Sequence, residues 1–308
     1  MSPTNVSQSV RDRLLNRSRE TGESHQALLT RFALERLLYR IGVSDVEDQF
    51  VLKGAYAFLV WQNDLHRPTK DLDLLGYGDP AQLEAVFQTV CQVDAPDDGV
   101  SFAPDSVQVE AIREQETYGG VRVTLNAYVG NAHLPLQVDV GFGDAVHPAP
   151  QATAFPTLLG FPAATLRTYP RETVIAEKLH GMVVFGIANS RMKDFYDVWY
   201  LSRTFDFDGS TLTEAINATF ERRDTSLPER TPSALTEAFA RDDRKQTQWK
   251  AFGNRTRLQA FEEDLPPVID QIRRFLYRPL ASLQAGHPFN QHWSAEGPWR
   301  PCPWKPRF

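Results

Sequence analysis

The chain has 308 residues, of which 42% are hydrophobic and 23% charged, a composition typical of a globular protein with one large domain or two ordinary ones. Its net charge of −6 at pH 7 argues against coating nucleic acid by bulk charge and leaves room for a local basic groove. No apolar run reaches the ~20 residues of a membrane helix, no secretion signal is visible, and two cysteines indicate neither a disulfide framework nor a zinc site. We therefore expect a cytoplasmic protein without a membrane partner.

The first part of the chain, residues 1–165, is predicted to mix helices and strands. Apolar residues recur with helical spacing in some segments and alternate with a period of two in others. Turn residues such as Gly, Asn and Asp separate the segments. The expected order is helix 6–20, helix 25–42, strand 50–53, a helix through 61, strand 71–75, helix 80–93, and strands 106–114, 119–129 and 134–144.

The second part, residues 166–308, is predicted to be a helical domain. Its tail, 287–308, is rich in Pro and Trp, so we expect neither regular helix nor central strand there. The tryptophans indicate that the tail packs along the body of the domain. The expected helices are 170–188, 192–205, 211–223, 233–241 and 256–276.

Two acidic residues interrupt an apolar strand in the stretch "KDLDLL". Residues two apart on a strand point the same way, so Asp71 and Asp73 share one face while Leu72 and Leu74 face the core. By the same parity, Asp139 emerges from the apolar strand 134–142. Carboxylates from two neighbouring strands repel one another unless a cation holds them, and Mg²⁺ bound between carboxylates and phosphates is the chemistry of nucleotidyl transfer.

An isolated Asp-x-Asp is more often an exposed pair or part of a turn. Two further features favour a site here, besides the parity of Asp139. The acids lie within apolar strands, and a glycine turn at Gly54 follows the strand "FVLK" and opens a helix, a geometry that suits phosphate.

Five stretches in order, "LKGAYAFLVWQ", "RPTKDLDLL", "LQVDVGFGD", "ETVIAEKLHGM" and "SRMKDFYDVWYLSR", together resemble the AbiEii-type nucleotidyltransferases, also called MenT-type toxins, of the polymerase-β-like superfamily. The resemblance runs from about residue 25 to residue 203. It implies an α+β fold, with a mixed β-sheet flanked by helices and a helical C-terminal domain. It also implies a toxin, opposed by an antitoxin, that adds nucleotides to the 3′ end of tRNA.

The resemblance also implies roles for individual residues. The Asp-x-Asp of the family maps onto Asp71 and Asp73 as metal ligands, its motif lysine onto Lys178, and its later acidic motif onto Asp194 or Asp197. One departure concerns the glycine turn, which in the family reads Gly-Gly-Thr or Gly-Ser. Here it reads Gly54, Ala55, Tyr56, so that backbone N–H groups remain to bind phosphate without the family's hydroxyl.

Several charged residues have a structural alternative. Lys178 flanks an apolar helical stripe and is either a snorkelling side chain or an ammonium for triphosphate oxygens. Asp194 and Asp197 are three apart on a helix. Either they belong to the site, where one of them orients Lys178 or serves as general base, or they form a plain surface pair with Lys193. Arg67 and Lys70 either neutralise the acids or bind the triphosphate, or only improve solubility.

A nucleic-acid surface is suggested by residues 241–257, which combine basic residues with Trp249 and Phe252 as an RNA groove does. The alternative is a solvated helix face with Trp249 packed inward.

We therefore expect an Mg²⁺- or Mn²⁺-dependent nucleotidyltransferase that uses an NTP and an RNA acceptor, most simply tRNA. Its metal ligands would be Asp71, Asp73 and Asp139. Two alternatives stay open: transfer to a small molecule or a protein side chain, and a binding protein with a vestigial site.

Overall fold

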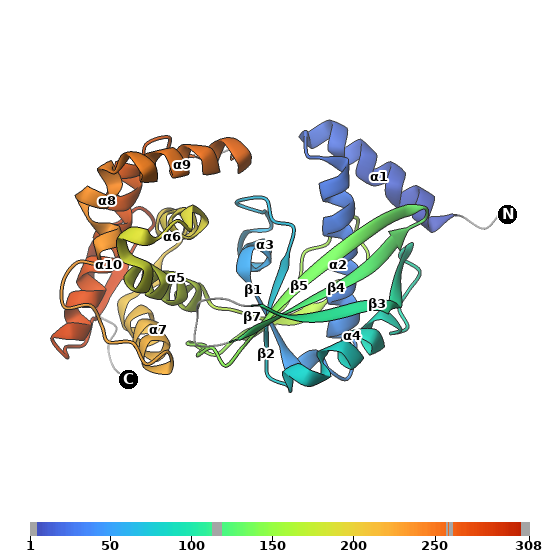
Figure 1. The fold of residues 1–308 in the computed structure, drawn as a ribbon, viewed down its shortest axis with the longest axis horizontal. Coiled ribbons are helices and arrows are strands. Elements are labelled where there is room, and N and C mark those ends of the chain that lie inside the picture. Colours follow the sequence, from blue (N-terminus) through green and yellow to red (C-terminus); the bar gives the residue numbers. More distant parts are fainter. Residues whose placement is uncertain (1–4, 113–118, 257, 259–260, 303–308) are drawn as a thin grey trace. The chain divides into compact units, whose positions relative to one another are not determined.

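The computed structural model describes residues 5–112, 119–256, 258 and 261–302, and the chain forms two compact units (Figure 1). The first unit comprises Met1–Asp144 with Pro150–Tyr169, and the second comprises Ala145–Ala149 with Pro170–Phe308. The first unit is a sheet with helices and the second is mainly helical, so the expected α+β fold is confirmed. The helical part begins at Pro170, whereas the sequence suggested a boundary after residue 165.

The first unit contains a seven-stranded mixed sheet of order β3-β4-β5-β2-β1-β7-β6. Strand β2 runs parallel to β5 and β1 parallel to β7, while the other neighbours are antiparallel. This pattern confirms the expected mixed sheet with an antiparallel part. The strands are β1 Phe50–Lys53, β2 Leu72–Gly76, β3 Val100–Ile112, β4 Gly120–Val129, β5 Ala132–Phe142, β6 Gln151–Ala154 and β7 Thr165–Thr168.

Four helices accompany this sheet, and α2 packs against β4, β5 and β7, while α4 packs against β3 (Figure 1). The apolar residues of α2 join those of the sheet in one hydrophobic core. Both expected N-terminal helices are present, and the side chain of Ser24, which precedes α2, makes no capping hydrogen bond. The helices are α1 Val6–Thr21, α2 His25–Gly42, α3 Ala57–Gln62 and α4 Leu83–Cys91.

Strands β4 and β5 have one buried and one half-exposed face. In β5, Leu136, Val138 and Val140 are at most 2% exposed, while Gln137 and Asp139 between them are half-buried. Strand β4 alternates in the same way. The polar residues therefore share the face that the hydrophobic core does not occupy, as the parity argument predicted.

The β4–β5 hairpin fixes which residues of the two strands lie opposite each other. Its tip is Gly130 and Asn131, with Val129 paired to Ala132, and Gly130 adopts a positive φ of 60° that favours glycine. Counting back from the tip, Arg122 pairs with Asp139.

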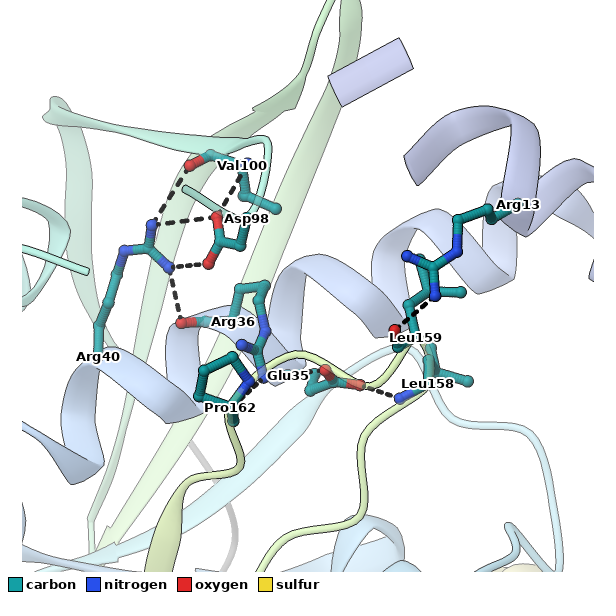
Figure 2. A network of polar contacts seen from close by, with 9 residues as sticks. All are labelled: Arg13, Glu35, Arg36, Arg40, Asp98, Val100, Leu158, Leu159 and Pro162. Carbon is teal, nitrogen blue, oxygen red and sulfur yellow. Dashed lines mark hydrogen bonds and ion pairs between the residues drawn. The ribbon is translucent and has the colours of Figure 1, made fainter. Parts of the chain in front are cut away.

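Helix α2 carries charged side chains into the core (Figure 2). Arg40 donates to both carboxylate oxygens of Asp98, at 2.9 and 3.4 Å, and to the backbone oxygens of Arg36 and Val100. Glu35 pairs with Arg36 at 2.9 Å and accepts a hydrogen bond from the backbone N–H of Leu158. These pairs tie the loop before β3 and the loop before β7 to one helix.

The second unit consists of six α-helices and a small sheet within its described residues. The sequence misplaced one of them, because the predicted helix 256–276 is in fact the end of α9 and most of α10. Pro266 and Pro267 follow Asp264 in the first turn of α10, where proline is tolerated. The helices are α5 Arg171–Phe185, α6 Met192–Thr204, α7 Gly209–Arg222, α8 Glu237–Arg241, α9 Asp243–Thr256 and α10 Leu265–Gln284.

The tail forms regular structure that the sequence did not predict. Strand β9, Gln291–Trp293, is the central strand of a three-stranded sheet with β8, Phe207–Asp208, and β10, Trp299–Pro301. The expectation that no central strand forms there was wrong, because β9 itself contains no proline. Packing of the tail on the body was correct, since Trp293 and Trp299 donate to the backbone oxygens of Ser202 and Phe275.

Among the described residues, no helix combines the length and the apolar character that crossing a membrane requires.

Candidate active site

The two neighbouring strands β2 and β5 bring acidic residues together on the half-exposed face of the sheet. Asp73 pairs in register with Asp139, so the two side chains project from the same face. Asp71 precedes the first residue of β2 by one position and has the same parity as Asp73. The assumption that these two strands are neighbours is confirmed.

Gly54 packs directly on the carboxylate of Asp73. A Cβ atom at Gly54 would lie 1.9 Å from Asp73 Oδ2, and the φ of this glycine is +67°. Any other residue would therefore clash with the carboxylate and strain the backbone. The sequence predicted a turn here because of Gly54. The contact with Asp73 explains why this residue is a glycine.

The rest of the turn is buried rather than open. Ala55 and Tyr56 are each 1% exposed, and Gly54–Tyr56 form a 3₁₀ turn before α3, which has only six residues. Burial raises the pKa of Tyr56, opposed by the positive charge of Arg31 and reinforced by the negative charges of Asp71 and Asp73. The Tyr56 phenol is therefore close enough to both carboxylates for their negative charges to raise its pKa.

Asp139 is held by an arginine. The Arg122 side chain donates from Nε and Nη2 to Asp139 Oδ1 and Oδ2, both at 2.9 Å. Gln137 adds hydrogen bonds of 3.2 and 3.3 Å to the same carboxylate. Among the described residues, no group of three or more His, Cys, Asp or Glu side chains is arranged to hold a metal ion. Arg122 and Gln137 hold Asp139 in this structure, so the expected convergence of Asp71, Asp73 and Asp139 on one cation stays a prediction.

The remaining carboxylates fit Mg²⁺ chemically. This ion usually takes one or two protein carboxylates and completes its octahedron with water and substrate phosphates. Asp71 and Asp73 are both half-buried, on the side of the sheet away from the core. The pair can supply two of the ligands that such an ion takes from the protein.

A second charged pair beside this face escaped the sequence analysis. Lys53 pairs in register with Asp73, and its Nζ lies 2.8 Å from Asp144 Oδ2 and 5.2 Å from the ring centre of Tyr169. The signal was available, because Lys53 directly precedes Gly54 in the quoted motif and Asp144 ends the quoted "LQVDVGFGD".

In the second unit, α5 and α6 bring Lys178 against two acids. Lys178 Nζ lies 2.6 Å from Asp194 Oδ1 and 2.8 Å from Asp197 Oδ2. The Asp197 side chain is only 1% exposed, compared with 12% for Asp194 and 16% for Lys178. The surface-pair alternative is wrong for Asp197, since this residue is buried, and both acids contact the lysine.

Four further polar residues lie either in the loop before β2 or in α5. Arg67 is half-buried and Lys70 exposed in the segment before β2. His180 Nε2 lies 2.9 Å from Thr225 Oγ1, and its Nδ1 lies 3.2 Å from Arg223 Nη1. The Glu177 side chain is 17% exposed, and its Oε1 lies 4.0 Å from Arg223 Nη2.

Residues 241–257 were suggested as an RNA groove, but the two aromatic side chains of this segment are buried in the core. Trp249 is fully buried and donates to the backbone oxygen of Glu262, and Phe252 is 5% exposed. The alternative of an inward-packed Trp249 is confirmed. Lys245 is also buried and donates to the Asn189 oxygen. Exposed basic residues remain at Arg244, Lys250 and Arg255, and Arg257 lies outside the described residues.

The mixed sheet and its paired carboxylates next to a glycine turn define a candidate nucleotidyltransferase. The family model described as nucleotidyl transferase AbiEii toxin, type IV toxin–antitoxin system, matches residues 36–272. The chain therefore belongs to the AbiEii nucleotidyltransferase family, and is a nucleotidyltransferase.

Three solved structures are similar to the chain. JHP933 from Helicobacter pylori is 17% identical, with a TM-score of 0.47 over 85% of this chain and 98% of its own. A second H. pylori protein, described provisionally as a nucleotidyltransferase, is 15% identical, with a TM-score of 0.47 over 85% and 99%. The antibiotic-resistance factor ANT(2'')-Ia is 13% identical, with a TM-score of 0.26 over 82% and 94%. No curated protein matches the chain.

Proposed function

We propose that this nucleotidyltransferase moves a nucleoside monophosphate from an NTP to the 3′ hydroxyl of an RNA, with tRNA as the expected acceptor. The hydroxyl loses its proton to water as its oxygen forms a bond to the α-phosphorus, the bond from that phosphorus to the bridging oxygen of the β-phosphate breaks, and pyrophosphate leaves. The observation that supports this most is the contact of Gly54 with Asp73, because it fixes a carboxylate against a turn suited to phosphate.

In the first unit, Asp71 and Asp73 are the proposed ligands of Mg²⁺ or Mn²⁺, with Asp139 as a third ligand once Arg122 releases it. The bound cation would neutralise charge developing on the α-phosphate and the leaving pyrophosphate. The protein's own contribution is to hold one carboxylate in β2 and the other directly before this strand, which orients both for binding.

The proposed phosphate contacts come from main chain and from cations. Gly54 and Ala55 offer backbone N–H groups, while Arg67 and Lys70 offer positive charge from the loop before β2. Lys178, which belongs to the second unit, is proposed by itself as a point charge for phosphate oxygens. Asp194 and Asp197 position it, because two carboxylates fix the direction of a flexible lysine side chain.

The test is transfer of label from each of the four α-labelled NTPs to total tRNA, with Mg²⁺ and with EDTA. We expect label on RNA with Mg²⁺ and one preferred NTP, and none with EDTA. Asp71→Asn and Asp73→Asn should each lose transfer by about a thousandfold or more, since each removes a charge that the cation needs. Asp45→Asn, an exposed acid outside the site, is the matched control.

Two results would count against the proposal: no transfer by the wild type with any NTP, or unchanged transfer by Asp73→Asn. Label appearing on a small molecule or a protein instead of RNA would redirect the acceptor assignment while keeping the chemistry.

The RNA is proposed to contact the exposed basic residues of α9. Because Trp249 and Phe252 are buried, this face offers phosphate contacts without base stacking. Replacing Lys250 and Arg255 with alanine should weaken tRNA binding similarly for all tRNAs and reduce the salt dependence by about one unit of slope per charge. Unchanged binding and salt slope would remove α9 from the RNA surface.

The proposed cellular role is that of a toxin in the cytoplasm, where NTPs and tRNA are present. Both cysteines, Cys91 and Cys302, are free thiols, as that compartment favours. Expression should arrest growth, Asp73→Asn should not, and co-expression of the product of an adjacent antitoxin gene should restore growth. Equal arrest by Asp73→Asn would show that transfer is not the cause.

A further inference from the structure

Four charged residues form a row across four adjacent strands of the sheet. The register pairs Lys53 of β1 with Asp73 of β2, Asp73 with Asp139 of β5, and Asp139 with Arg122 of β4. Directly paired residues project from the same face. The row therefore places two neighbouring carboxylates between two cations.

Arg122 meets Asp139 in the geometry of the strongest ion pairs. Two parallel N–H to oxygen bonds of 2.9 Å occupy both carboxylate oxygens, which is the bidentate arrangement that planar guanidinium favours. A carboxylate offers about four lone pairs, and Gln137 donates to the same two oxygens at 3.2 and 3.3 Å, so a divalent cation would have to displace one of these donors. Arg122 and a metal ion therefore cannot both use Asp139 fully at one time.

The influence of Arg122 reaches beyond its direct partner. Asp73 is paired in register with Asp139, the partner of Arg122, so the guanidinium stands one strand away from the second carboxylate. The guanidinium thus compensates part of the negative charge of the carboxylate face as a whole. Water reaches both members of the pair, whose side chains are 33% and 21% exposed, so the contact can open without unpacking the core.

We propose that Arg122 is a built-in competitor of the divalent cation: it holds Asp139 in an ion pair that the metal must displace. This inference rests on the proposed function, since it concerns the same metal face. Its consequence is that metal alone binds weakly. An NTP, whose triphosphate offers the released guanidinium an anionic partner, makes the exchange favourable, so metal and nucleotide bind cooperatively.

The test is Mn²⁺ binding to the full chain without nucleotide, measured by the loss of the free-ion electron paramagnetic resonance signal. Arg122→Gln removes the competing charge, and we expect its Mn²⁺ dissociation constant to fall by about tenfold, the size expected for one charge at close range in a partly hydrated site. Arg122→Lys keeps the charge but loses the two parallel hydrogen bonds. Its Mn²⁺ dissociation constant should therefore lie between those of the wild type and Arg122→Gln. Arg274→Gln, an exposed arginine paired with Asp270 in α10, makes the same change in net charge and should bind Mn²⁺ as the wild type does.

A second measurement addresses the coupling. Addition of a nonhydrolysable NTP analogue should tighten Mn²⁺ binding by a larger factor in the wild type than in Arg122→Gln. Circular dichroism and urea unfolding establish that both variants are folded before binding is measured.

Equal Mn²⁺ affinity of wild type and Arg122→Gln, including no detectable binding by either, would overturn the competition. Asp73→Asn separates this failure from failure of the proposed function. If Asp73→Asn abolishes Mn²⁺ binding while Arg122→Gln leaves it unchanged, the metal face stands and only the role of Arg122 falls. If Asp73→Asn binds Mn²⁺ as tightly as the wild type, the metal face falls as well.

Discussion

Two arginine–aspartate pairs in the first unit use the same chemistry in different surroundings. The side chains of Arg40 and Asp98 are 8% and 3% exposed, and Arg40 shares its donors with two backbone oxygens (Figure 2). The side chains of Arg122 and Asp139 are 33% and 21% exposed, on a sheet face that the core does not cover. We therefore regard the Arg40–Asp98 pair as structural, because Arg40 also donates to backbone oxygens. We expect the Arg122–Asp139 pair to exchange its partners, because water reaches it.

The largest expected effect is on the buried pair. Arg40→Gln leaves Asp98 charged and buried, so the free energy of unfolding should fall by about 3–5 kcal/mol. Urea unfolding followed by circular dichroism measures this loss. The double variant Arg40→Met with Asp98→Leu removes both charges and should recover most of it. A double variant no better than the single one would show that the backbone bonds of Arg40, and not the ion pair, carry the stability.

The position of Asp73 in the charged row depends on its contact with Gly54. Gly54→Ala pushes a methyl group into the Asp73 carboxylate, and displacement by about 1 Å should reduce transfer by about a hundredfold. Gly22→Ala is the matched control, because Gly22 has a φ of +76° with no heavy atom within 4 Å of its Cβ position. It imposes the same backbone strain without a clash. Similar losses of transfer in both variants would attribute the effect to general destabilisation.

The buried pair formed by Glu35 and Arg36 should give stability a pH dependence. Burial raises the pKa of Glu35 above its ordinary 4.5, against the opposing charge of Arg36. The folded state then holds this proton more tightly than the unfolded state, so the contribution is most favourable below 4.5 and declines as pH rises through the elevated pKa. We therefore expect the free energy of unfolding to decrease across that window.

Urea unfolding at several pH values should show this slope in the wild type and its absence in Glu35→Gln, which cannot titrate. A slope that persists in the variant would have to come from other groups.

The smallest expected effect is the stability change caused by Arg122→Gln. Water replaces the guanidinium around a half-exposed Asp139, so the free energy of unfolding in EDTA should fall by no more than about 1 kcal/mol. The measurement is the same urea titration as for Arg40→Gln. Equal losses in the two variants would erase the distinction between a structural and an exchangeable pair.

Much of the first unit could be predicted from local sequence. The alternation in 134–142 placed Val138 and Val140 in the core and Asp139 on the opposite face, because strand parity follows from backbone geometry alone. Parity did not predict that Asp73 and Asp139 lie side by side, because it does not contain the order of the strands in the sheet. Arg122 could also have been found, since the two-residue tip at Gly130 and Asn131 fixes its register with Asp139.

What escaped prediction depends on packing between distant segments. Trp249 looked suited to stacking on a base, but its burial is decided by neighbours such as Phe261, whose ring centre lies 5.0 Å away. The central position of β9 depends on β8, more than eighty residues earlier in the chain. The contact of Lys178 with both acids required the relative placement of two helices, which spacing within either helix does not contain.

The tip of the β4–β5 hairpin has a consequence for insertions and deletions. Gly130 and Asn131 are exposed, and by surface position alone they would be tolerant of an added residue. One added residue that propagated as a slip along β5 would instead turn every side chain of that strand over. It would send Asp139 into the apolar layer and Val138 or Val140 opposite Arg122. The length of this turn is therefore as constrained as the identity of any residue in the charged row.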